Sequence, residues 1–258
     1  MLGAIAGDII GSVHEGAGTK TRDFPLFVAG STFTDDSVLT VAVADALLHG
    51  GDYVDLFHDY FHRYPDAGFG GHFRGWAARR DREPYNSWGN GSAMRVSPVG
   101  FAARSLDEAL AEARRSAAVT HDHPEGIRGA QAIAAAIYLA REGGDKAEIK
   151  ARLEALFGYR LGKSLADIRP GYRFDVSCQG SVPPSIIAFL ESEDVESAIR
   201  NAISLGGDAD TMVCMAGGIA EAYYGGLPED LKEETLARLD PPLREVVERF
   251  RARHGVSA

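Results

Sequence analysis

Cysteine is scarce in this sequence, since only Cys178 and Cys214 occur among its 258 residues. Two cysteines are too few for a disulfide framework, and they lack the CxxC spacing of a zinc or redox site. Each is therefore expected to be a small buried apolar residue. This usage fits a reducing compartment, so we expect a cytoplasmic protein.

Long apolar runs are also missing. The sequence contains no run of eighteen or more consecutive apolar residues, which argues against a transmembrane helix. No basic region precedes the first apolar residues, and Asp8 interrupts them before they reach the length of a signal peptide. We therefore expect neither secretion nor membrane association.

Basic residues are outnumbered. The chain has 27 Lys and Arg against 37 Asp and Glu, a formal net charge of −10, and the acidic excess is spread along the sequence. A general nucleic-acid-binding function is disfavoured, because neutralising phosphates requires a face rich in Lys and Arg. A local phosphate site remains compatible with this composition.

Strands with strict alternation of apolar and polar residues are scarce, whereas apolar residues recur at helical spacing in eight segments. The predicted helices are Val38–Leu48, Val54–Phe61, Leu106–Ala118, Ile127–Leu139, Ile149–Phe157, Val195–Ile203, Met212–Tyr223 and Leu243–Phe250. The chain contains no repeat and no linker of low complexity. We therefore predict an all-α fold with a single domain over residues 1–258.

Three Gly- and aromatic-rich stretches separate the predicted helices: Gly68–Gly75, Tyr85–Gly91 and Pro170–Pro184. Long irregular loops in a compact domain are often functional. Aromatic residues at helical spacing around the first stretch, Phe69, Phe73 and Trp76, are expected to form a buried stripe. Tyr85 and Trp88 then remain as aromatic residues that could contact a ligand, for example by stacking on adenine.

Two distant segments each place two aspartates and a threonine at the start of a predicted helix. They contribute Thr34, Asp35 and Asp36 to the first helix, and Asp208, Asp210 and Thr211 to the second. Taken separately, each segment is explained by helix capping and by the favourable position of acids near a helix N-terminus. Together they offer hard oxygen donors, which suit magnesium, manganese or calcium rather than zinc. Four carboxylates would repel one another unless cations neutralised them, so we predict convergence on two divalent cations.

Five motifs occur along the chain in a characteristic order. They are Gly3–Ser12 followed by Glu15, Thr34–Ser37, Gly89–Arg95, Thr120–Pro124 and Ser204–Thr211. Each motif alone is weak, but with all five in this order the sequence resembles the ADP-ribosylglycohydrolase family over nearly its whole length. That family includes the dinitrogenase-reductase-activating glycohydrolase and the ADP-ribosyl-acceptor hydrolases.

The resemblance implies an all-α, compact multi-helix bundle of the ADP-ribosylglycohydrolase type with a dinuclear Mg²⁺ or Mn²⁺ centre. The implied activity is hydrolysis of the glycosidic bond between ADP-ribose and a modified acceptor, which is a protein side chain or a small molecule. The metal ligands that the resemblance implies are Thr34, Asp35, Asp36, Asp208, Asp210 and Thr211. Glu15 and Asp36 become the candidate proton acceptors, and we favour Glu15 because a carboxylate bound to metal is a poor base. From residue type alone, Glu15 could equally be a solvated acid.

The substrate is expected to lie against the glycine-flanked turn and the two histidines, with Gly89, Asn90, Gly91, Ser92, His121 and His123 as candidate contacts. Backbone N–H groups of the turn could face the pyrophosphate. The simpler interpretation is a tight turn that needs positive φ at Gly89 or Gly91. The histidine pair is not assigned to zinc, because no third nitrogen or sulfur ligand is spaced nearby.

Two alternatives come from other classes. One is a catalytically silent relative that binds ADP-ribose or is purely structural, although all six expected ligands are present. The other is a divalent-metal phosphoesterase, which the same oxygen ligands could support. In each case we expect a monomer.

Overall fold

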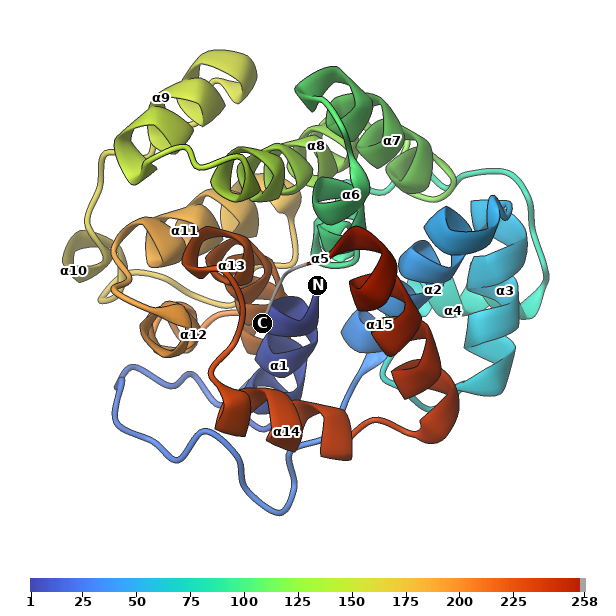
Figure 1. Cartoon of the computed structure of the whole chain (residues 1–258), viewed down its shortest axis with the longest axis horizontal. Coiled ribbons are helices and arrows are strands. Elements are labelled where there is room, and N and C mark those ends of the chain that lie inside the picture. Colours follow the sequence, from blue (N-terminus) through green and yellow to red (C-terminus); the bar gives the residue numbers. More distant parts are fainter. Residues whose placement is uncertain (256–258) are drawn as a thin grey trace.

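Helices form the regular structure of the chain, apart from an isolated β-bridge between Gly89 and Ser177 (Figure 1). The computed structural model describes residues 1–255, and in this range it contains no β-strand, so the predicted all-α fold is confirmed. The helices are α1 (Leu2–Gly11), α2 (Asp35–His49), α3 (Tyr53–Arg63), α4 (Gly71–Ala78), α5 (Gly91–Met94), α6 (Ser97–Ala102), α7 (Leu106–Ala118), α8 (Pro124–Arg141), α9 (Lys146–Phe157), α10 (Leu165–Ile168), α11 (Cys178–Leu190), α12 (Val195–Ile203), α13 (Ala209–Tyr224), α14 (Glu229–Ala237) and α15 (Pro241–His254). Within the described range, none of these helices has the length and apolarity required to cross a bilayer.

The eight segments predicted from periodicity all lie within helices, namely α2, α3, α7, α8, α9, α12, α13 and α15. The buried stripe of Phe69, Phe73 and Trp76 is also confirmed. Periodicity did not detect α1, because all ten of its residues are buried and it has no polar face. The stretch Gly68–Gly75 is irregular only in its first part, because α4 begins at Gly71.

Helix α11 corrects a second expectation, since the stretch Pro170–Pro184 was predicted to be irregular. The helix begins at Cys178 and continues through Pro183 and Pro184. A proline inside a helix leaves the carbonyl four residues earlier without its N–H donor. For Pro184 that carbonyl belongs to Gly180, and the hydroxyl of Tyr172 donates to it at 2.9 Å. A tertiary hydrogen bond therefore replaces the one that the proline removes.

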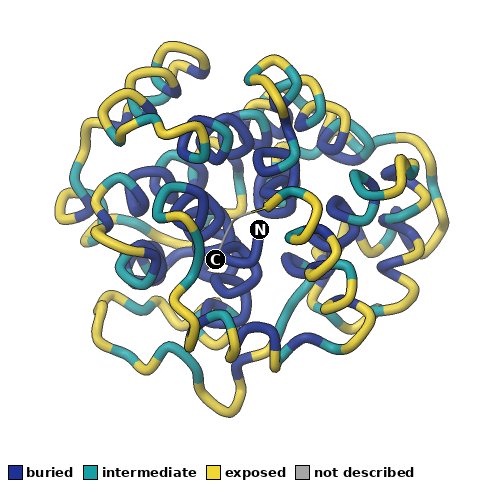
Figure 2. The backbone as a smooth tube through the Cα atoms, in the orientation of Figure 1, coloured by how far each residue is buried: buried dark blue, intermediate teal, exposed yellow. Residues whose placement is uncertain are grey.

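Helices α1 and α13 occupy the centre of the molecule, and the other helices surround them (Figures 1 and 2). Helix α13 packs against α1, α8, α11 and α12, while α2, α3, α4 and α15 lie together on one side. Burial follows this arrangement, because α1 is buried throughout and α13 is buried from Ala209 to Ala222. The N-termini of α2 and α13 are consequently fixed by packing against the buried helices at the centre of the fold.

Glycines at four-residue spacing allow α1 to approach α13 at backbone distance. A Cβ added at Gly3, Gly7 or Gly11 would lie 2.3–2.5 Å from backbone atoms of α13. At Gly11 the obstructing atom is the Cα of Asp210, at 2.5 Å. Small residues are therefore required along this face of α1. The contact at Gly11 places the end of α1 directly beside the acidic start of α13.

Substituting Gly11 with alanine should push the start of α13 away from α1. We expect the free energy of unfolding to fall by about 1–3 kcal/mol, as is typical of overpacking, and divalent-cation affinity to fall by about tenfold as Asp210 moves. Calorimetric titration with Mn²⁺ and thermal unfolding would measure both. Gly171→Ala is the matched control, because nothing lies within 4 Å of a Cβ added there. Equal cation affinity in the two variants would contradict the expectation.

Candidate functional site

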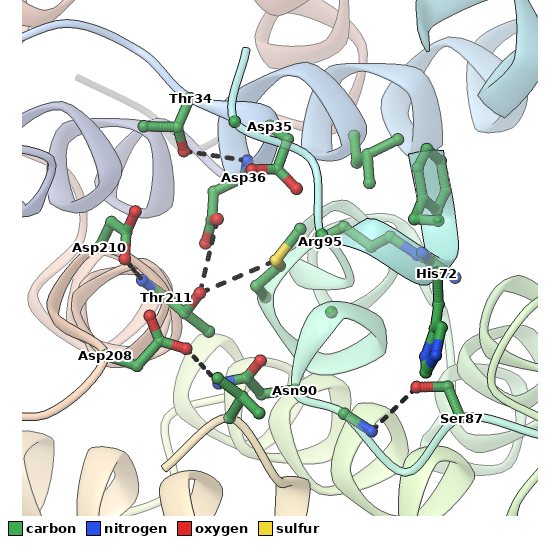
Figure 3. A pocket seen from close by; sticks show the side chains of 18 of the residues that line it. Thr34, Asp35, Asp36, His72, Ser87, Asn90, Arg95, Asp208, Asp210 and Thr211 are labelled. Carbon is green, nitrogen blue, oxygen red and sulfur yellow. Dashed lines mark hydrogen bonds between the residues drawn. The ribbon is translucent and has the colours of Figure 1, made fainter. Parts of the chain in front are cut away.

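The two Asp-rich helix starts face each other across a cavity (Figure 3). Thr34 caps α2, its side chain accepting a hydrogen bond from the N–H of Asp36 at 3.2 Å. Asp208 stands at the N-cap position of α13, but its side chain makes no capping bond. The Thr211 hydroxyl lies 3.5 Å from Oδ2 of Asp36, although the two residues are 175 positions apart in the sequence. The structure thus brings together the segments that sequence analysis paired.

Asp8 of α1 belongs to this site and was not among the predicted site residues. Its carboxylate accepts hydrogen bonds from the N–H and hydroxyl of Thr34, at 2.9 and 2.6 Å. It also accepts bonds from the N–H and hydroxyl of Ser37, the former at 3.0 Å. Asp8 therefore ties the first turn of α2 to α1. The only sequence signal was its place in the first motif, where burial could not be inferred.

The carboxylates form two overlapping groups whose oxygen atoms lie within 4.8 Å of one another. One group comprises Asp8, Asp36 and Asp210, and the other comprises Glu15, Asp208 and Asp210. Among residues 1–255, no Lys, Arg or His side chain forms an ion pair with any of them. The Oδ1 atom of Asp36 is buried and has no hydrogen-bond partner in this range. Concentrated oxygen ligands with an unpartnered buried carboxylate atom fit hard divalent cations.

Burial and mutual repulsion make these carboxylates weaker acids than usual. Burial, followed by the charge of Asp208, raises the pKa of Asp210 from 3.8 to about 9. Burial, followed by Asp8, raises the pKa of Asp35 to about 7. Burial also raises the pKa of Asp36, with Asp210 as the next cause. The ionised cluster is consequently unfavourable until a positive charge compensates it.

Stability of the metal-free protein should depend on pH in a specific direction. A carboxyl group whose pKa is raised by folding binds its proton more tightly in the folded state, so it stabilises the fold at low pH. That contribution is lost as the pH rises above 3.8, the ordinary pKa of an aspartate. The loss continues through the raised pKa values of Asp35, about 7, and of Asp210, about 9. In the presence of chelator, the free energy of unfolding should therefore fall between about pH 5 and pH 9.

Saturating Mg²⁺ or Mn²⁺ should flatten this dependence, because cation binding requires deprotonated ligands. Denaturant unfolding at several pH values, with chelator or with cation, measures both slopes. The variant Asp210→Asn provides the control, since it should reduce the slope in chelator. A slope that is the same with and without cation would contradict a shared cation site.

The cavity has a volume of about 330 Å³. It is lined by residues from both Asp-rich segments, from the three predicted irregular stretches and from the histidine motif. Eleven residues predicted for the site lie on its wall: Glu15, Thr34, Asp35, Asp36, Gly89, Asn90, Gly91, His121, Asp208, Asp210 and Thr211. Two predicted contacts do not line it. Ser92 is buried and donates to the carbonyl of Gly126 at 2.7 Å, and Nδ1 of His123 accepts the N–H of Glu125 at the start of α8.

The glycine-flanked turn has a different rationale from the one expected. Neither Gly89 nor Gly91 has positive φ. Space is tight instead, because a Cβ at Gly91 would lie 3.2 Å from Nε2 of His121, and one at Gly89 would lie 3.2 Å from Oγ of Ser87. The N–H groups of Gly89 and Asn90 are already used, by Ser87 Oγ and by the carbonyl of Val176. They are therefore not free to bind a pyrophosphate.

Asn90 links the turn to the acidic cluster, since its Nδ2 donates to Oδ2 of Asp208 at 2.8 Å (Figure 3). This bond favours the ionised form of Asp208, whose pKa is nevertheless raised by burial. Residue type and spacing could not predict this pairing, because Asn90 and Asp208 are 118 positions apart.

Exposed apolar residues lie at the mouth of the cavity. Phe174 and Val176 line the cavity and are 50% and 54% exposed. Trp88 is 54% exposed but does not line the cavity, because its ring packs edge-on against His123; only its backbone pairs with this segment, since Cys178 N–H donates to the Trp88 carbonyl. Tyr85 also lines the cavity. Phe174 and Val176 were missed individually, although the irregular stretch that contains them was predicted to be functional.

Comparison with known proteins gives a consistent result. The ADP-ribosylglycohydrolase family model matches residues 1–256. The chain is 29% identical to ADP-ribosylhydrolase ARH3 of Bos taurus, with 87% of this chain and 84% of that protein aligned. It is 27% identical to ADP-ribosylarginine hydrolase Tri1 of Pseudomonas putida (strain GB-1), over 91% of this chain and 72% of that protein. A solved structure described as an ADP-ribosylglycohydrolase-related protein complex superposes with a TM-score of 0.69 at 27% identity, covering 96% of each chain.

Proposed function

The chain belongs to the ADP-ribosylglycohydrolase family of enzymes, which hydrolyse ADP-ribose linkages, and on this premise we propose that it is a dinuclear-metal-dependent hydrolase. It cleaves the glycosidic bond between ADP-ribose and a modified protein side chain or small molecule. The observation that carries the proposal is the convergence of Asp36, Asp208 and Asp210 around one cavity, where no Lys, Arg or His side chain of residues 1–255 forms an ion pair with them. We further propose that residues 1–258 act as a single domain, as a monomer in the cytoplasm.

Six residues would hold two cations, Mg²⁺ or Mn²⁺: Thr34, Asp35, Asp36, Asp208, Asp210 and Thr211. When bound, the cations would neutralise the carboxylates, orient ribose hydroxyls and make a water molecule more acidic. Asp8 holds Thr34 directly and, through Ser37, fixes the first turn of α2, which carries Asp35 and Asp36. Asn90 holds Asp208 in the same way.

Glu15 is the residue best placed to move a proton. It is exposed at the cavity wall, within 4.8 Å of carboxylate oxygens of Asp208 and Asp210. Desolvation and the charges of Asp208 and Asp8 raise its pKa, which brings a carboxylate closer to the working pH of a general base. Its Oε atom accepts the proton of the attacking water as the bond from the anomeric carbon to the acceptor breaks, and the resulting carboxylic acid returns that proton to the departing acceptor atom. Asp36 is instead buried and committed to the cluster.

Glycosidic cleavage at the ribose passes through an oxocarbenium-like state, which the carboxylates surrounding the anomeric carbon stabilise. The rest of ADP-ribose extends from the acidic cluster along the turn at Gly89–Gly91 and His121. The cavity then opens at an apolar rim formed by Phe174 and Val176, and the exposed Trp88 lies on the segment whose backbone pairs with this rim. The adenine ring lies at this rim, where an exposed aromatic face is available for stacking.

Loss of the Trp88 side chain should weaken binding of ADP-ribose without a comparable loss of stability, because the side chain is largely exposed. Stacking of a base on an aromatic ring contributes about 1–3 kcal/mol, so Trp88→Ala should raise Kd by about tenfold. Trp88→Phe should retain most of the affinity. Leu156→Ala, which shortens an exposed apolar residue of α9, is the control in the same calorimetric assay. Equal affinities of wild type and Trp88→Ala would place adenine elsewhere.

The activity is tested with a panel of ADP-ribosylated acceptors that includes arginine-linked, serine-linked and small-molecule conjugates. Purified protein is incubated with each in Mg²⁺, Mn²⁺ or chelator, and free ADP-ribose is measured. Release of intact ADP-ribose that requires a cation supports the proposal. Cleavage of the pyrophosphate would instead indicate a phosphoesterase, and binding without turnover would indicate a catalytically silent relative.

A further inference from the structure

Arg95 is a fully buried arginine that forms no ion pair with a carboxylate of residues 1–255. Its Nη2 donates to the carbonyl of Ser116 at 3.0 Å and to the hydroxyl of Thr120 at 2.8 Å, and its guanidinium lies over the ring of Phe57. The Nε and Nη1 atoms have no hydrogen-bond partner in residues 1–255. Burial lowers its pKa only to about 10, so it remains a cation at neutral pH. Such a buried charge is costly, and its effect on neighbouring groups is correspondingly strong.

The hydroxyl of Thr120 connects Arg95 to His121, since Thr120 Oγ1 lies 2.8 Å from Nδ1 of the imidazole. An arginine can only donate, so Thr120 accepts from Arg95. The positive charge of Arg95 makes the Thr120 oxygen a poorer acceptor for a second donor. An Nδ1–H of His121 that points at this oxygen is therefore disfavoured. The hydroxyl proton therefore points at Nδ1, which accepts it. A neutral imidazole that accepts at Nδ1 carries its proton on Nε2.

The Nε2 atom of His121 is directed at the ligand cavity. His121 lines that cavity although only 5% of the residue is exposed. Nε2 lies close to the turn, 3.2 Å from the position of a Cβ at Gly91, and makes no hydrogen bond within residues 1–255. Burial, followed by the charge of Arg95, lowers the pKa of His121 well below its usual range, so the ring is neutral. A neutral ring has one N–H, and here it faces the cavity.

We propose that Arg95 and Thr120 are positioning residues that hold His121 in its Nε2–H tautomer, making the imidazole a hydrogen-bond donor to an oxygen of the bound ligand. The identity of that ligand as ADP-ribose rests on the proposed function, and the acceptor is a phosphate oxygen beside the turn. The Nε2–H of His121 takes the role that was expected of the backbone N–H groups of Gly89 and Asn90, because those two groups already donate to Ser87 Oγ and to the Val176 carbonyl. The positive charge of Arg95, which lines the same cavity (Figure 3), further favours an anionic group beside His121.

The tautomer is measured directly from the ¹⁵N shifts of the His121 ring in the Mg²⁺-loaded protein, and ADP-ribose affinity is measured by calorimetry. Wild type should show a protonated Nε2 and an unprotonated Nδ1. Thr120→Val preserves side-chain shape but removes the hydroxyl, so Nδ1–H should become populated and Kd should rise by about tenfold, as expected for a lost donor to a charged group. Thr120→Ser, which restores the hydroxyl, should recover the wild-type tautomer and most of the affinity.

Thr235→Val is the matched control, because it removes a buried threonine hydroxyl that donates to the Leu231 carbonyl in α14. It should lower the melting temperature while leaving the His121 tautomer and the affinity unchanged. A protonated Nδ1 in wild type would overturn the inference, and this measurement requires no variant. An unchanged tautomer and affinity in Thr120→Val would overturn it as well. The stated tautomer together with no binding of ADP-ribose would support the positioning of His121 by Arg95 and Thr120 and would count against the proposed function.

Discussion

Replacing Asp208 with asparagine should abolish hydrolysis while leaving the fold intact. The substitution removes a negative oxygen ligand from the cluster with Glu15 and Asp210. Loss of an outer-shell partner of a metal typically costs 10–100-fold in activity, so loss of a ligand should cost more than about 100-fold. The bond from Asn90 Nδ2 can be retained by the new side-chain carbonyl, which preserves local packing.

The metal-free variant should be at least as stable as the wild type at neutral pH. Burial raises the pKa of Asp208, so its ionised form opposes folding when no cation is present. Activity across a range of Mn²⁺ concentrations and thermal unfolding in chelator measure the two effects. Asp145→Asn is a matched control, because Asp145 caps α9 and asparagine caps a helix equally well. Near-wild-type turnover of Asp208→Asn at saturating Mn²⁺ would show that Asp208 is not a required ligand.

Glu15→Gln should reduce kcat by about two orders of magnitude or more, the usual range for loss of a general acid or base. The change keeps the size of the side chain and removes its ability to accept a proton. Because Glu15 is exposed at the cavity wall and not buried within the cluster, the Kd for the product ADP-ribose should change much less. Steady-state kinetics and product binding on one preparation provide both numbers.

Glu233→Gln, at an exposed position of α14, is the control for a change of net charge. Three results distinguish the roles of Glu15. A loss confined to kcat supports proton transfer. A large loss of affinity with kcat preserved would make Glu15 a binding or gating residue. Wild-type values of both kcat and Kd would indicate that Glu15 is only a solvated acid.

Local sequence patterns were sufficient to predict much of the helical structure. Capping and periodicity depend on residues within a few positions of one another, so Thr34 was correctly expected at the start of α2. The same locality explains the failures. Helix α1 has no polar face to create a pattern, and α11 tolerates its prolines only because Tyr172 bonds the released carbonyl of Gly180.

The acidic residues of the two predicted ligand segments could be recognised by their type, because oxygen donors at helix starts suit divalent cations and recur in family order. Their juxtaposition depends on the fold. It results from the glycine face of α1, which lets the backbone of Gly11 reach Asp210, and from Asp8, which binds Thr34 and Ser37.

Sequence by itself thus determined the all-α class, eight of the helices and the family motifs, because each depends on residue types and spacing along the chain. Tertiary structure alone decided which residues meet. It directed Asn90 to Asp208, placed Ser92 and His123 outside the cavity wall, and connected Arg95 through Thr120 to His121. Hydrogen bonds and close packing between distant segments depend on three-dimensional distance, and no local pattern in the sequence records that distance.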